Sequence, residues 1–145
     1  MNKILFFCAI LLSFAWSSFV QAGNLMTIDA KMNCLNIANV LTNVGYEIGG
    51  SPSEINGLTK GQYMVEVISS NANYGNGATD YRALEAVIWY GSRIKGSTIW
   101  YQTVQIGKPV VINYTPDFGI YGFIPDIKCA DNTGATVLNV RKIAP

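Results

Sequence analysis

Short segments in which apolar and polar residues alternate follow one another along most of the chain, and this is the pattern of half-buried β-strands. Residues 62–69 give the clearest example, because Tyr63, Val65 and Val67 share one side and β-branched residues are frequent. The same alternation recurs downstream, so we predict a chain made mainly of strands. The predicted strands are 25–32, 62–69, 84–90, 97–104, 108–114, 119–125 and 135–142.

The connections between these segments are rich in Gly, Asn and Ser, which favour turns. Residues 45–61 have the composition of turns around a short strand at 46–48, whereas residues 35–41 fit either a strand or one to two helical turns. Strands that recur roughly every 8–12 residues, without a long helix or a repeat, are typical of a β-sandwich. We therefore predict a single all-β domain, an antiparallel β-sandwich of about eight strands.

The first 22 residues have the pattern of a secretory signal peptide. Lys3 supplies the positive start, residues 4–16 are apolar, and Val20-Gln21-Ala22 places small residues before the expected cleavage site. The apolar run is too short for a membrane span, and no other run approaches the required ~20 residues. We expect cleavage after residue 22, leaving residues 23–145 as one periplasmic or secreted domain without a membrane span.

Composition and charge narrow the classes of function. The 145 residues include 10 Lys and Arg, 9 Asp and Glu, and no His. This near-neutral balance argues against a nucleic-acid partner, and the lack of His excludes His-dependent nucleophilic catalysis and His-ligated metals. Glu66 and Glu85 could face each other as in a glycosidase, but solvated outward positions explain them better. We do not expect an enzyme.

Two cysteines, Cys34 and Cys129, remain after removal of the signal peptide, which contains Cys8. An even number of cysteines in an exported chain indicates a disulfide between them. Such a bond would close a loop of about 95 residues and contribute about 4 kcal/mol in the chain-entropy model. The alternative is two separate buried thiols.

Oxygen-bearing side chains gather in the loop that follows the strand at 119–125. Asp126 is followed by Asp131 and Asn132, with main-chain carbonyls between them. Calcium binds six to eight oxygens in flexible geometry, so this loop is a candidate calcium site, although the spacing is not that of an EF-hand. The alternative is a plain turn in which these side chains cap local backbone groups.

The order of segments along the chain resembles the galactophilic lectin family of opportunistic bacteria, over about residues 63–140. The resemblance implies a jelly-roll sandwich with one calcium ion shared between the protein and two sugar hydroxyls. It implies a main-chain carbonyl ligand from Tyr74 and side-chain ligands from Asp126, Asp131 and Asn132. The segments that carry the resemblance are 63–69, 72–75, 84–90, 120–126 and 131–140.

From the resemblance and the loop chemistry we expect a calcium-dependent, carbohydrate-binding domain with a sugar or glycoconjugate as its partner. Tyr81, Phe118 and Tyr121 are candidates for covering the apolar face of the sugar ring, although aromatic residues between strands more often pack in a core or over an edge. The alternative function is a protein-binding module without calcium: an inhibitor, an immunity factor or an adhesion subunit. Assembly into a homo-oligomer stays open.

Overall fold

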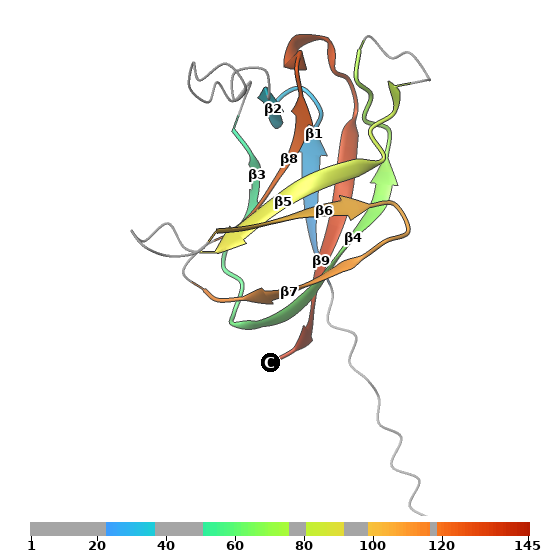
Figure 1. Cartoon of the computed structure of the whole chain (residues 1–145). Coiled ribbons are helices and arrows are strands. Elements are labelled where there is room, and N and C mark those ends of the chain that lie inside the picture. Colours follow the sequence, from blue (N-terminus) through green and yellow to red (C-terminus); the bar gives the residue numbers. More distant parts are fainter. Residues whose placement is uncertain (1–22, 37–50, 76–80, 92–98, 117–118) are drawn as a thin grey trace, which may run out of the picture.

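Two β-sheets pack face to face in the computed structural model of the chain, which describes residues 23–36, 51–75, 81–91, 99–116 and 119–145 (Figure 1). No helix in these ranges is long and apolar enough to cross a membrane. The first sheet has the order β1 (Asn24–Asp29), β9 (Ala135–Ala144), β4 (Gly61–Ser70), β7 (Val110–Tyr114). The second has the order β2 (Cys34–Asn36), β8 (Ile120–Asp126), β5 (Glu85–Gly91), β6 (Ile99–Gln105), and β3 (Ser53–Ile55) also pairs with β8.

The strand pairing defines a jelly roll. The first strand pairs with the last (β1 with β9), and moving inward β3 pairs with β8, β4 with β7 and β5 with β6, all antiparallel. This is the order of a long hairpin folded over into two sheets, as in jelly-roll domains. The predicted all-β, jelly-roll-like sandwich is therefore confirmed. β2 departs from the antiparallel pattern, since it runs parallel to β8.

The core lies between the sheets and follows the alternation seen in the sequence. On β4, Tyr63, Val65 and Val67 are buried, and β5 and β9 bury every second residue in the same way. A fully buried Ile, Leu or Val contributes roughly 1.5–3 kcal/mol relative to an exposed one. Gly122 on β8 lets the two sheets approach closely, because a Cβ there would come within 2.5 Å of Met26 and Ile28.

The seven predicted strands named above are all present in the described part of the chain, with ends that shift by a few residues. The prediction missed β3, which is short and lies in the turn-rich stretch before residue 61. Within residues 35–41 the described part, up to Asn36, is extended and belongs to β2. The rest of that segment and the strand predicted at 46–48 lie outside the described residues.

The predicted disulfide is present and joins Cys34 on β2 to Cys129 in η2 (Cys129–Asp131), a short 3-10 helix in the loop between β8 and β9. Cys34 and Cys129 are both buried, and their Cα atoms are 5.6 Å apart. The bond connects segments that are 95 residues apart in the sequence. It therefore anchors the β8–β9 loop to the edge of the second sheet.

Candidate functional site

The structure brings the Tyr74 segment and the β8–β9 loop together at one end of the sandwich, which we call the loop end. Asn73 donates its backbone N–H to the carbonyl of Thr133 at 2.8 Å and accepts the N–H of Thr133 at 3.1 Å. The Asn71 side chain accepts a hydrogen bond from the N–H of Ala135 at 2.8 Å. Gly134 has a φ of 76°, and a Cβ there would collide with the Asn71 carbonyl. Tyr74 and Asn132, 58 positions apart, are thus held on neighbouring backbone segments.

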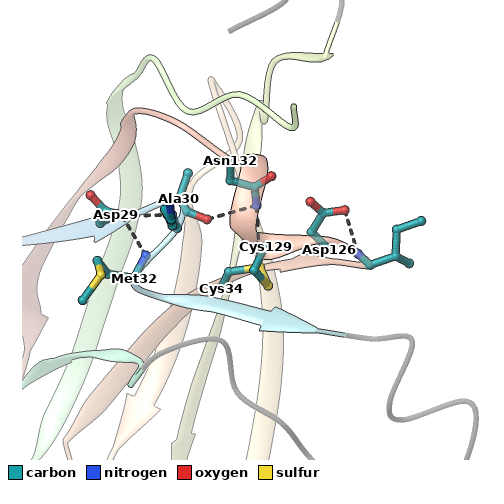
Figure 2. Close-up of a disulfide and its surroundings, with 9 residues drawn as sticks. Asp29, Ala30, Met32, Cys34, Asp126, Cys129 and Asn132 are labelled. Atoms are coloured by element: carbon teal, nitrogen blue, oxygen red, sulfur yellow. Dashed lines mark hydrogen bonds between the residues drawn. A yellow bond between two sulfur atoms is a disulfide. The ribbon is translucent and has the colours of Figure 1, made fainter. Parts of the chain in front are cut away.

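Asn132 is a buried side chain of this loop, and only one of its two polar atoms has a hydrogen-bond partner. It is 2% exposed, and its Nδ2 donates to the carbonyl of Ala30 at 3.0 Å and lies 3.6 Å from the Cys34 sulfur (Figure 2). Because a carbonyl only accepts, the amide nitrogen must face Ala30, and this fixes the amide orientation. The Oδ1 atom points the other way and is buried without a hydrogen-bond partner. Leaving a buried acceptor unpaired costs about 1–3 kcal/mol, so a hydrogen-bond donor or a cation beside Oδ1 would stabilise the folded chain.

The two carboxylates of the loop are arranged differently. Asp126 ends β8, is half-buried, and accepts a hydrogen bond from the N–H of Ile127 at 2.7 Å (Figure 2). Asp131 lies in η2 and forms an ion pair with Lys128, with Nζ and Oδ2 2.9 Å apart. Lys128 lowers the pKa of the Asp131 carboxyl, mainly through this hydrogen bond. Any cation that binds Asp131 must therefore compete with Lys128.

Tyr74 shares its surroundings with Asp126. Its side chain packs against the core, and its N–H donates to the carbonyl of Tyr81 at 2.8 Å. Burial raises the pKa of the Tyr74 phenol to about 12, and the negative charges of Glu85 and Asp126 add to the shift. Glu85 itself accepts a hydrogen bond from Gln105 at 2.9 Å. The end of the sandwich thus combines acidic groups with a phenol that stays protonated at neutral pH.

The three aromatic residues predicted to contact sugar have different positions. Tyr81 is 60% exposed and lies beside Tyr74 through the hydrogen bond to its carbonyl. Tyr121 lies within β8, five residues before Asp126, which corresponds to about 16 Å along a strand. Phe118 lies outside the described residues. Of the two that are described, the structure brings only Tyr81 to the loop end.

The donor set of the loop suits calcium better than a transition metal. No group of three or more Cys, Asp or Glu side chains placed to hold a metal ion occurs among the described residues. A cation at this end of the sandwich would depend on Asp126 and Asp131, on the Asn132 amide oxygen and on main-chain carbonyls. Such hard oxygen ligands are typical of calcium sites rather than of transition-metal sites.

A second chemical feature, the aromatic cluster on the outer face of the second sheet, was missed by the sequence analysis. The Trp89 ring lies 6.0 Å from Tyr101, 5.3 Å from Tyr121 and 6.5 Å from Phe123, measured between ring centroids. Alternation within each strand was visible in the sequence. The registers that place Trp89 opposite Tyr101 and Tyr121 were not, because strand pairing across the chain has no local signal.

Comparison of the chain with protein-family models, with curated proteins and with solved structures finds no match in any of the three.

Proposed function

We propose that the chain is an exported, lectin-like domain that binds carbohydrate through a calcium ion held by the β8–β9 loop. The ligands would be the side chains of Asp126, Asp131 and Asn132 and the main-chain carbonyl of Tyr74. The observation that carries the proposal is the Asn132 amide, whose oxygen is buried and accepts no hydrogen bond while its nitrogen is engaged by Ala30. A cation beside Asp126 would satisfy that oxygen.

The chemistry of calcium fits a binding rather than a catalytic role. Calcium takes six to eight oxygens, so a site with two carboxylates and an amide leaves positions that sugar hydroxyls can fill. The loop is anchored by the Cys34–Cys129 disulfide, so the ligand positions are set before binding. Disulfides form in oxidising compartments, which agrees with export guided by the N-terminal signal sequence.

Thermal unfolding with calcium and with excess chelator tests the metal part of the proposal. A ligand that binds only the folded state adds about 2.7 kcal/mol at a concentration one hundred times its dissociation constant. We expect calcium to raise the melting temperature, magnesium to raise it less, and Asn132→Ala to lose the calcium response. Identical curves with calcium and chelator would refute the calcium site.

The carbohydrate part needs a separate experiment. We expect binding on a glycan array in calcium and none in chelator. Asp126→Ala should abolish this binding while circular dichroism and the melting curve without calcium stay near those of the parent chain. The matched control is Asp29→Ala, which removes a carboxylate that caps its own turn, by accepting from the N–H groups of Lys31 and Met32. Glycan binding that survives Asp126→Ala would contradict the proposed site.

A second candidate function, protein binding without calcium, is favoured by β6. This strand is at the end of the described order of the second sheet and carries no charged residue, while Trp100 and Tyr101 are 58% and 57% exposed. Uncharged, apolar edge strands are ready to pair with a strand from another chain. This function predicts a partner whose binding is insensitive to chelator and is lost in Tyr101→Lys.

A further inference from the structure

A cavity of about 360 Å³ opens beside the disulfide, next to the candidate calcium loop. Its volume falls in the range of small-molecule sites and is large enough for one sugar ring. Part of its wall is the segment between Asp126 and Asp131, so the cavity and the calcium loop share backbone. The residues that line it are Lys31, Asn36, Ile127, Lys128, Cys129 and Ala130.

Two lysines from different segments line this cavity. Lys31 lies in the turn between β1 and β2, and Lys128 precedes η2 with its side chain 71% exposed. Three acids lie nearby: Asp29 caps its own turn, Asp131 is paired with Lys128, and Asp126 pairs with Asn36 in the β2–β8 register. The exposed Ile127 and Ala130 add apolar surface to the same wall.

The ion pair between Lys128 and Asp131 couples the cavity to the loop. A cation that takes Asp131 as a ligand removes it from Lys128, which leaves that ammonium group without its partner at the rim. The cation also cancels the negative charge of Asp126 and Asp131. Occupation of the calcium site therefore makes the cavity more attractive to an anion.

We propose that this cavity binds the carboxylate or sulfate group of an anionic sugar, such as a uronic acid or a sulfated hexose. The inference rests on the proposed function, since the hydroxyls of the same sugar would be held at the calcium loop. Lys31 and Lys128 supply the positive charge, and Ile127 supports the ring. The preferred ligand class is thus acidic rather than neutral saccharide.

Calorimetric titrations of the chain with galacturonate, galactose 6-sulfate and galactose, each in calcium, test this preference. We expect both anionic sugars to bind more tightly than galactose and to weaken as sodium chloride is raised. Lys31→Gln and Lys128→Gln should each weaken them by about three- to fivefold, the scale of an exposed ion pair. Galactose binding should stay unchanged in saturating calcium, where Lys128 no longer competes with the ion for Asp131. Lys108→Gln, at an exposed position between β6 and β7, is the matched control.

Inorganic sulfate provides a probe that needs no sugar binding. We expect its addition, with calcium present, to shift the amide NMR signals of residues 127–130, and Lys31→Gln to reduce the shift. If galactose binds as tightly as the anionic sugars and sulfate shifts no signal there, the anion site is wrong and the proposed function stands. If no sugar binds while sulfate still acts through Lys31, the carbohydrate proposal fails and the anion site stands.

Discussion

The loop end and the aromatic face of the second sheet each bury a polar atom without a hydrogen-bond partner, but the two atoms have opposite character. In the loop the atom is an acceptor, Oδ1 of Asn132, at the end of the sandwich that also holds Asp126. On the sheet it is a donor, Nε1 of Trp89, inside a cluster of aromatic rings. A cation can satisfy an acceptor near carboxylates, whereas a donor among rings can bond only weakly, to their π faces.

The two regions also differ in the contacts that hold their side chains in place. The loop is fixed by the disulfide and by backbone hydrogen bonds to the Asn71–Asn73 segment, so the unpaired Oδ1 of Asn132 is held in place at some cost in stability. The aromatic cluster is fixed by ring contacts at 5.3–6.5 Å, each of which stabilises the sheet. Substitutions at the two regions should therefore change ligand response and stability in different proportions.

The largest effect is expected from removal of the disulfide. The double variant Cys34→Ala, Cys129→Ala should lose about 3–5 kcal/mol of unfolding free energy, because the denatured chain regains the entropy of a 95-residue separation. Urea denaturation of the variant measures the loss, and the parent chain under reductant serves as the control. A loss below about 1 kcal/mol would mean that packing alone holds the loop to β2.

The next effect is expected at the centre of the aromatic cluster. Trp89→Ala should cost about 2–3 kcal/mol, somewhat less than a fully buried tryptophan, because Trp89 is half-buried. Its calcium response should stay unchanged, in contrast to any variant of the loop. Trp89→Phe is the matched control: it keeps an aromatic ring and removes the unpaired N–H. If Trp89→Ala also removed the calcium response, the two regions would not be independent.

The two regions also differ in how far their structure could be predicted from the sequence. Alternation is a local property, so the strands and their buried faces, such as Tyr63, Val65 and Val67, were predictable. β3 was not, because three residues with one buried side chain carry too little periodicity. The aromatic cluster depends on the register of β5 against β6 and β8, which joins distant segments and leaves no local trace.

For the loop, the sequence indicated which residues could bind a cation but not how their side chains are oriented. Their side-chain oxygens marked Asp126, Asp131 and Asn132 as candidate ligands. The even number of cysteines after removal of the signal peptide indicated the Cys34–Cys129 bond. The sequence had no means to show that Lys128 pairs with Asp131, or that the Asn132 nitrogen is taken by Ala30. The ion pair depends on the local geometry of η2, and the hydrogen bond to Ala30 depends on how the turn after β1 meets η2.

A moderate loss of stability is expected when the Asn132 side chain is removed. Asn132→Ala removes the hydrogen bond to the buried Ala30 carbonyl and also removes the unpaired Oδ1, so the net loss of stability should be about 1–2 kcal/mol. The same variant should lose the stabilisation by calcium, and this loss is the more telling result. Asn113→Ala, at an exposed position on β7, is the control and should keep the full calcium response.

The smallest effect concerns Tyr74, whose phenol has a raised pKa because it is buried and because Glu85 on β5 and Asp126 of the loop are negatively charged. Its pKa is about 12 in the folded chain and about 10 when unfolded, so between these values the unfolded chain loses the proton first. Stability from this group is complete below pH 10 and is lost as the pH rises toward 12.

Tyr74→Phe should remove that part of the pH dependence, so the urea midpoints of parent and variant should converge or cross as the pH increases from 9 to 11.5 (about the range set by the two pKa values). The effect is modest because Tyr74 is only partly buried and solvent screens the two carboxylates. Burial also raises the pKa of Tyr90, but Tyr90 is present in both proteins and cancels in the difference. Two profiles that stay parallel throughout would mean that the Tyr74 phenol titrates alike in both states, and that water reaches it more readily in the folded chain than its burial indicates.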